Sequence, residues 1–481
     1  MAENSRRRKW TTRHVWLYRL FLAALLSSGH LFSACRAELV ASAATAPIDP
    51  VLQRIWQSAT ASDAAYQKLI ELCDDIGHRL SGSPQLDLAA AWAVKALRQD
   101  GIATARLEPV MVPKWLRGKE SLQLVAPRAM PLVMLGLGGS TATPVGGLKA
   151  EVLVVRDLAE LKTRAAAAKG KIVLFNQAMP AWTPQHGSGY GDTVQQRVHG
   201  AQWAFEHGAV AALVRSVTAQ SLSTPHTGGT RHQGRGTPVP VAAISVEHAE
   251  LLARFAARGI KTEVLLQMEA HEEEPAASHN VVAELIGSEH PGDIVVIGGH
   301  LDSWDVGQGA HDDGAGVVAA MQALATLQRL GLQPKRTIRV VLFTNEENGL
   351  AGGKAYFEAH KAERHVALLE ADSGGFAPVG LGVHGKDDAG TAALAAWAGP
   401  WLQALAAIVQ LQVVPGEGGA DISPWLQLGV PNFGLVVQGE KYFDYHHTAA
   451  DTVDKVDAKE LARCAATMAV VAWQLAERPP D

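Results

Sequence analysis

The stretch DIVVIGGHLDSWDVGQGAHDD, residues 293–313, carries the pattern that decides the fold. Its opening run, 293–298, has no polar interruption after Asp293, which predicts a buried strand. An apolar-periodic helix is expected over 314–330, with Gly331 as its C-terminal cap. The stretch therefore predicts a strand, a polar loop and a helix in succession.

Two further strands are expected downstream, over residues 337–344 and 365–371. Strands that alternate with helices predict an α/β sheet with helices on both faces. In such sheets, functional sites lie at the C-terminal ends of the strands.

Polar clusters occur at these strand ends and near the C-terminus. They are Gly299-His300-Leu301-Asp302, Asp312-Asp313, Asn345-Glu346-Glu347, Ala371-Asp372-Ser373 and Tyr445-His446-His447-Thr448. Histidines and carboxylates without thiolates suit zinc or a similar divalent ion. The pattern predicts a metal site at one edge of the sheet.

Each cluster alone has an ordinary structural explanation. Asp313 is suited to cap the helix that begins at Gly314, and a lone acidic residue after a strand is usually a cap or a solvated loop residue. A lone histidine is more often part of the core or the surface than a ligand. The joint occurrence of metal-compatible clusters at successive strand ends favours a functional site.

Several catalytic motifs are missing from the sequence. His271-Glu272 begins like an H-E-x-x-H zinc motif but lacks the second histidine. No G-x-S-x-G elbow and no phosphate-binding loop occur, and the glycines at 136–139 lack the dinucleotide-binding spacing. The sequence therefore excludes the helical zincin plan, the serine hydrolase elbow and the common nucleotide loops.

Four longer motifs resemble a known family. They are GGHLDSWDVGQGAHDDGAG (298–316), FTNEENG (343–349), LEADSGG (369–375) and YHHTAADT (445–452). They resemble the co-catalytic dizinc exopeptidases of the aminopeptidase Y and glutamate carboxypeptidase type, over roughly residues 65–475. The resemblance implies a zinc-exopeptidase (phosphorylase/hydrolase-like) mixed sheet flanked by helices, with an inserted protease-associated domain. It also implies two Zn²⁺ per chain, a peptide substrate and hydrolysis of dipeptides or short peptides.

The resemblance also implies roles for individual residues. The implied metal ligands are His300, Asp312, Glu347, Asp372 and His447, with Asp312 shared between the two ions. Glu346 is expected to be the general base, and Asp302 to hold the far ring nitrogen of His300. A cis peptide is expected at Asp312-Asp313.

The choice of His447 over His446 also follows the family. The family ligand precedes an aspartate by four residues, and Asp451 lies four residues after His447.

Two other function classes share this catalytic fold. Glutaminyl cyclases resemble it and use one zinc ion to close an N-terminal glutamine, so the ligand set alone does not exclude this acyltransferase activity. A non-catalytic binding protein, like the transferrin receptor ectodomain, would be expected to lose ligands, whereas all five are present here with the base. The number of bound metal ions distinguishes the first two classes.

The composition indicates more than one domain. The 481 residues are 47% hydrophobic and 19% charged, which excludes a disordered chain and gives a prior of two to three domains. We expect parts of the catalytic domain at 44–117 and 273–481, around a protease-associated insert at 118–272 with short strand-like runs. The pI of about 6.4 argues against a nucleic-acid partner. A homodimer is expected from the resemblance.

The N-terminal segment 1–43 has the layout of a secretory signal peptide: a basic patch, an apolar stretch and small residues. Cleavage is expected near 34, with a lipid anchor on Cys35, or near 43. The protein is therefore expected to be exported, as a periplasmic, secreted or membrane-anchored lipoprotein. Loss of residues 1–34 removes six Lys or Arg and one acidic residue, which changes the formal net charge from −5 to −10.

The other two cysteines, Cys73 and Cys464, would be able to pair in an oxidising compartment. Both lie in helix-like apolar surroundings, where buried free thiols are common, so we expect them to be unpaired.

Overall fold

The computed structural model describes residues 48–220, 222–231 and 236–480, and Asp49–Asp481 forms one compact unit. The expected signal peptide and Cys35 lie outside the described residues. Within the described part of the chain, none of the helices is long and apolar enough to cross a bilayer.

The first sheet is mixed, as the resemblance implied. Its strand order is β1 (Arg106–Val112), β12 (Ala276–Leu285), β14 (Arg336–Phe343), β13 (His290–His300), β15 (Arg364–Glu370), β18 (Asn432–Val437), β16 (Pro378–His384) and β17 (Gln412–Pro415). The central strands β14, β13, β15 and β18 are parallel, whereas β1, β12 and β14 pair antiparallel. The prediction of an α/β fold is confirmed. The expected strands 293–298, 337–344 and 365–371 correspond to β13, β14 and β15.

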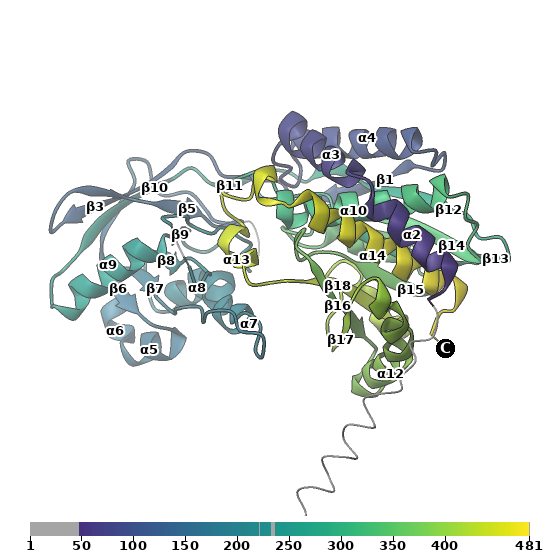
Figure 1. Cartoon of the computed structure of the whole chain (residues 1–481). Helices are drawn as coiled ribbons and strands as arrows, with labels where there is room; N and C mark the ends of the chain where they lie inside the picture. Colours follow the sequence, from purple (N-terminus) through teal and green to yellow (C-terminus); the bar gives the residue numbers. More distant parts are fainter. Residues whose placement is uncertain (1–47, 221, 232–235, 481) are drawn as a thin grey trace, which may run out of the picture. The chain divides into compact units, whose positions relative to one another are not determined.

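Helices cover this sheet. The central helices α10 (Ala315–Arg329) and α14 (Ala458–Glu477) pack on each other and on β13, and α2 (Pro50–Thr60) lies along α14 (Figure 1). Further helices are α3 (Ala64–Ile70), α4 (Pro84–Gln99), α11 (Ala351–His360) and α12 (Asp388–Ala404). Tyr356 and Phe357 of α11 pack with Trp425 in a buried hydrophobic cluster that includes Val341 and Phe343 of β14. Gly331 has a φ of +65°, as expected for the residue that ends α10.

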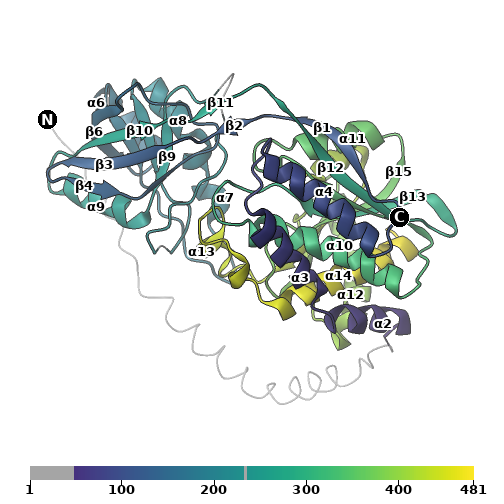
Figure 2. The same cartoon turned by 90° about the horizontal axis from the view of Figure 1, so that it is seen from above.

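A second sheet lies within the range predicted for the insert. Its strand order is β4 (Met130–Leu132), β3 (Glu120–Ala126), β10 (Glu263–Met268), β6 (Leu148–Val155), β7 (Ile172–Phe175), β8 (Ala211–Arg215), β9 (Val241–Ile244) and β5 (Met134–Gly136). Its helices are α5 (Leu158–Thr163), α6 (Ala165–Ala168), α7 (Tyr190–Thr193), α8 (Gln195–Glu206) and α9 (Val246–Ala257) (Figure 2). Buried side chains of β6–β9 form its own core.

The chain passes between the two sheets through a short two-stranded ribbon. β2 (Trp115–Leu116) pairs antiparallel with β11 (His271–Glu272). His271 and Glu272, which begin like a zinc motif in the sequence, therefore belong to a paired strand. The ribbon ties together the chain segments that enter and leave the second sheet.

Cys73 and Cys464 are both buried and unpaired, as expected. Burial raises the pKa of each thiol to about 12, which keeps the sulfur protonated and unreactive at neutral pH.

The close pairing of β13 with β14 makes a specific prediction at Gly298. A Cβ at this residue would lie 2.1 Å from the carbonyl oxygen of Val341, a backbone atom that cannot move without opening the sheet. Gly298→Ala should therefore lower the free energy of unfolding by about 1–3 kcal/mol or more. Gly292→Ala lies in the same strand with open space around it and serves as the control. Thermal melting of both variants tests this, and equal melting temperatures would contradict it.

Candidate metal centre

The polar clusters meet at the C-terminal edge of the parallel strands. His300 is the last residue of β13, Glu346 and Glu347 follow β14, and Asp372 follows β15. Because β13 is parallel to both neighbours, these three ends lie side by side. The turn η2 (Ala310–Gly314), which leads into α10, brings Asp312 to the same place.

Asp312 lies between two histidines that come from distant parts of the chain. Its Oδ1 is 3.3 Å from His300 Nε2, and its Oδ2 is 3.1 Å from His447 Nε2. His300 Nε2 is also 3.4 Å from Asp372 Oδ1, and His447 Nε2 is 3.0 Å from Glu347 Oε2. Two groups of possible ligands therefore share one carboxylate.

These separations fit metal coordination. Ligands about 2.1 Å from a tetrahedral ion lie roughly 3.4 Å from one another, close to the observed gaps. Three sets of side chains are grouped tightly enough to hold an ion: His300 with Asp312 and Glu347, His300 with Asp313 and Asp372, and Asp312 with His446 and His447. The donors are nitrogen and oxygen atoms, as in zinc metallopeptidases.

The charges of these clustered ligands favour a bound cation. Burial would raise the pKa of Asp312, but the imidazoles of His300 and His447 hold it well below its usual range. Burial also opposes the charged form of His447, yet the carboxylates of Glu347 and Asp312 raise its pKa to about 10. Glu347 Oε1 is buried and accepts no hydrogen bond from the described residues. A divalent ion would neutralise these carboxylates and take the place of the histidine protons.

His446 and His447 occupy different positions at the centre. Their rings stack with centroids 3.5 Å apart, and His446 Nε2 lies 3.7 Å from Asp312 Oδ2. The corresponding distance from His447 is 3.1 Å, and His447 alone of the two is paired with Glu347 among the described residues. The geometry is therefore compatible with the choice of His447 made on the resemblance.

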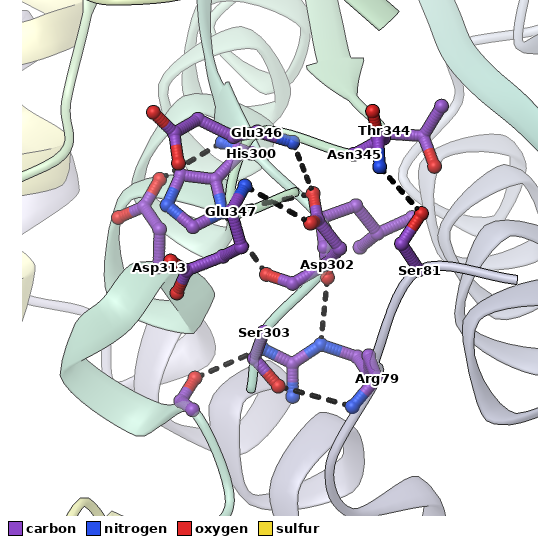
Figure 3. Close-up of polar contacts among 12 residues, drawn as sticks. Arg79, Ser81, His300, Asp302, Ser303, Asp313, Thr344, Asn345, Glu346 and Glu347 are labelled. Atoms are coloured by element: carbon purple, nitrogen blue, oxygen red, sulfur yellow. Dashed lines mark hydrogen bonds and ion pairs between the residues drawn. The ribbon is translucent and has the colours of Figure 1, made fainter. Parts of the chain in front are cut away.

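Asp302 contacts both His300 and the turn that carries Glu346 and Glu347. The far ring nitrogen of His300, Nδ1, lies 3.0 Å from the backbone oxygen of Asp302 and 3.8 Å from its carboxylate. The carboxylate instead accepts the N–H groups of Glu346 and Glu347, at 2.9 and 3.3 Å (Figure 3). Asp302 therefore orients His300 through its main chain and holds the 346–347 turn through its side chain.

Two buried aspartates to which the sequence assigned no role in the metal site support the ligand loops. Asp313 accepts the N–H of His300 at 3.0 Å as well as that of Gly316 at 3.1 Å, so it does more than cap α10. The Asp312-Asp313 peptide is cis, as the resemblance implied. Asp451, noted in the sequence only for its spacing, accepts the N–H groups of His311 and Asp312 at 2.8 and 3.1 Å.

Arg79 organises the loop that joins His300 to Asp312. It is fully buried and donates to the carbonyl oxygens of Leu301, Gln308 and Gly309 at 2.7–2.9 Å (Figure 3). No local sequence pattern reveals this role, because the acceptors are main-chain atoms more than 200 residues away.

The second sheet also contributes to the centre. The Thr227 N–H donates to the carbonyl oxygen of His447 at 3.0 Å, and His447 Nδ1 lies 3.2 Å from the carbonyl oxygen of Thr227. The Trp304 N–H donates to Glu347 Oε2 at 2.6 Å, while its ring packs in the core of the second sheet. Both His447 and Glu347 are thus oriented by groups tied to the insert.

A pocket of about 340 Å³ opens onto the centre. It is lined by Tyr190, Arg197, Gly229, Asp312, Glu346, Glu347, Asp372, Tyr442, Phe443, His446 and His447. Sequence reasoning missed Tyr190, Arg197 and Gly229, because they lie in the insert and belong to no motif. Pockets of this size accommodate small molecules or short peptides.

Comparisons with known proteins agree with this geometry. The model of peptidase family M28 matches residues 280–472. Carboxypeptidase Q of Xenopus laevis is 42% identical over 419 residues, which cover 87% of this chain and 87% of that protein. Carboxypeptidase Q of Homo sapiens is 42% identical over 423 residues, which cover 87% and 86%.

Solved structures show the same similarity. A crystal structure of a peptidase M28 precursor from Shewanella amazonensis SB2B matches with a TM-score of 0.83 and 36% identity, over 90% of this chain and 98% of that one. A zinc aminopeptidase from Bacillus subtilis matches in fold, with a TM-score of 0.63 and 20% identity, over 86% and 95%.

Proposed function

Since the chain belongs to peptidase family M28, we propose that it is a dizinc exopeptidase that hydrolyses dipeptides or short peptides with Glu346 as general base. Membership of the family makes the chain a metallo-exopeptidase homologous to carboxypeptidase Q. The observation that carries the finer proposal is the position of Asp312, with one carboxylate oxygen near His300 and the other near His447.

In this proposal the chain holds two ions with one shared carboxylate. His300 and Asp372 would hold the first ion, Glu347 and His447 the second, and Asp312 both. When bound, the two ions supply Lewis acidity, which polarises the scissile carbonyl group and acidifies a water molecule.

Two observations support Glu346 as the general base. It lines the pocket, whereas its neighbour Glu347 is engaged by the Trp304 N–H and by His447. Burial, reinforced by the nearby carboxylates of Asp372 and Glu347, raises the pKa of Glu346 well above its usual value. In the reaction Glu346 takes a proton from the attacking water and delivers it to the leaving amine.

Metal content and product identity test this function. The purified protein should carry two divalent ions per chain, because the ligands form two groups around Asp312. Chelators should abolish its hydrolysis of dipeptides, and returning Zn²⁺ should restore it. One tightly bound zinc ion at full activity, with cyclisation of N-terminal glutamine in place of hydrolysis, would identify an acyltransferase of the glutaminyl cyclase type and refute the proposal.

Two neighbouring substitutions separate the base from the ligand. Glu346→Gln should keep both ions and lose about 10²–10⁴-fold in kcat, because it removes the base but no ligand. Glu347→Gln should weaken binding at one site, because a neutral amide is a poorer ligand for a dication, and excess metal should restore part of its activity. Metal analysis and kcat of the two purified variants check this. Loss of an ion from Glu346→Gln with full loading of Glu347→Gln would reverse the assignment.

The proposal extends to the protein's location and assembly. The sequence of residues 1–43 supports export, with cleavage near 34 and a lipid on Cys35, or cleavage near 43. The second sheet would be a protease-associated domain, and the protein a homodimer. Mass spectrometry of the protein isolated from cells should find a chain that starts near residue 35 or 44. An intact N-terminus in the cytosol would contradict export, and a monomeric mass at full activity would contradict the dimer.

A further inference from the structure

His311 precedes the shared ligand Asp312 in the chain, but it belongs to none of the ligand groups and does not line the pocket. It is 1% exposed, and both of its ring nitrogens are engaged. The Gly375 N–H donates to Nδ1 at 3.1 Å, and Nε2 lies 3.2 Å from the carbonyl oxygen of Lys455. Because Nδ1 accepts a hydrogen bond, the ring proton is on Nε2, which donates to Lys455. The imidazole therefore joins two loops, as an acceptor toward one and a donor toward the other.

Two aromatic rings hold the imidazole in this orientation. The Phe376 ring is nearly parallel to it, with an interplanar angle of 9° and centroids 4.2 Å apart. The Tyr445 ring is also nearly parallel, at 8° and 5.6 Å. A Cβ at Gly374 would lie 3.0 Å from Nδ1, so the main chain passes close to the ring. The His311 side chain is therefore fixed by stacking as well as by hydrogen bonds.

The contacts of this imidazole reach the segments that carry Asp372 and His447, which are expected at different ions. Residues 373–376 form the loop after Asp372, and Tyr445 precedes His447 by two positions. The next residue along the chain is Asp312, the ligand expected at both ions. The ring thus lies where the three ligand-carrying segments meet.

The two segments that the ring joins differ in their other support. The His447 segment is held independently of the ring, by the main chain of Thr227 and the carboxylate of Asp451. The loop after β15 has less support. In the part of the chain that the structure describes, the Gly375 N–H is the one main-chain N–H of residues 372–376 with an acceptor, and that acceptor is the imidazole. The path of this loop therefore depends on the ring more than the path of the His447 segment does.

We propose that His311 is a positioning residue: it fixes the place of Asp372 and thereby strengthens binding of the ion at that ligand. This inference rests on the proposed two-ion centre, in which His300, Asp312 and Asp372 hold that ion. The hydrogen bond lies three residues beyond Asp372 and sets the path of the loop that carries it. Gly375 is buried, so without the imidazole its N–H would be left unpaired, and the loop would move to satisfy it.

An isosteric pair of substitutions tests this role. Asparagine places its side-chain oxygen where Nδ1 lies and can accept the Gly375 N–H, whereas leucine has nearly the same shape and no acceptor. His311→Leu should weaken Zn²⁺ binding at Asp372 by about 10–100-fold, the usual effect of losing a group that orients a metal ligand, and His311→Asn should keep most of the affinity. Stepwise calorimetric titration of the metal-free protein with Zn²⁺ measures this without any substrate.

A double-mutant cycle identifies the ligand through which His311 acts. In the Asp372→Asn protein, His311→Leu should cost little further affinity, because the ligand that it positions is already lost. In the His447→Gln protein, His311→Leu should cost nearly as much as in the wild type. Should His311→Leu fail to fold, His311→Gln takes its place, because its amide reaches the position of Nε2 and leaves the Gly375 N–H without an acceptor.

His365→Leu is the matched control. His365 is also buried, at 7% exposure, and its ring contacts the Tyr356 hydroxyl at 2.9 Å and the Trp425 ring with centroids 3.8 Å apart. It lies at the start of β15, whereas Asp372 follows the other end of that strand. His365→Leu should lower the melting temperature and leave the Zn²⁺ affinities unchanged.

Three results would overturn the inference. The first is equal Zn²⁺ affinity in the wild type and in His311→Leu. The second is an equal loss in His311→Leu and His311→Asn, which would mean that the imidazole only fills space in the core. The third is a full further loss in the Asp372→Asn protein, which would mean that His311 acts through another ligand. If Zn²⁺ binding responds as expected while the loaded enzyme hydrolyses no peptide, the proposed function fails and the positioning role stands.

Discussion

The structure around the centre depends on one constraint: several carboxylates are buried together at the end of a parallel sheet. Asp312, Glu347 and Asp372 lie within about one ligand spacing of His300 or His447. Buried like charges repel one another strongly in a medium of low dielectric constant. They are tolerated only where cations and N–H donors compensate them. Much of the neighbouring architecture supplies those donors, through main-chain N–H groups aimed at Asp302, Asp313 and Asp451.

Because of this arrangement, the loops that carry the metal ligands are held mainly through their own main-chain N–H and C=O groups. The carboxylate of Asp302 fixes the N–H groups of the 346–347 turn, and Asp451 fixes those of residues 311 and 312. Arg79 acts on the opposite kind of main-chain group: its guanidinium donates to carbonyl oxygens of the loop between His300 and Asp312. A buried acid or base that binds the main chain at two or more points sets the path of a loop, and the path sets the ligand geometry.

The sequence predicted the central part of this design well. The uninterrupted apolar run before His300 marks a strand buried on both faces, and parallel strands bring their C-terminal ends together, so the meeting of His300, Glu347 and Asp372 followed from elementary rules. The family, the α/β mixed sheet and the metallopeptidase class are confirmed. The identity of the second sheet as a protease-associated domain, the number of ions and the role of each residue remain predictions.

The contributions that the sequence did not predict share a physical cause. Thr227 acts through its backbone, which is the same in every residue type and leaves no mark in the sequence. Tyr190 and Arg197 lie in the helices α7 and α8 of the insert and belong to no motif. The contact of Asp302 with the His300 ring likewise uses a carbonyl oxygen. Residue type predicts side-chain chemistry, whereas long-range main-chain contacts depend on how two segments meet.

The hydrogen bonds between Thr227 and His447 have a consequence for how this protein tolerates change. Both bonds use the main chain of residue 227, whereas its buried hydroxyl donates to the carbonyl oxygen of Gly136. A point substitution here would therefore remove a different contact and leave the two main-chain bonds available. The length of the loop is a different matter. Inserting or deleting a single residue there would move the carbonyl oxygen by a full chain step and leave Nδ1 of His447 without its acceptor. In the evolution or engineering of this enzyme, the position of the His447 ring therefore depends on the length of this loop more than on the side chain of residue 227.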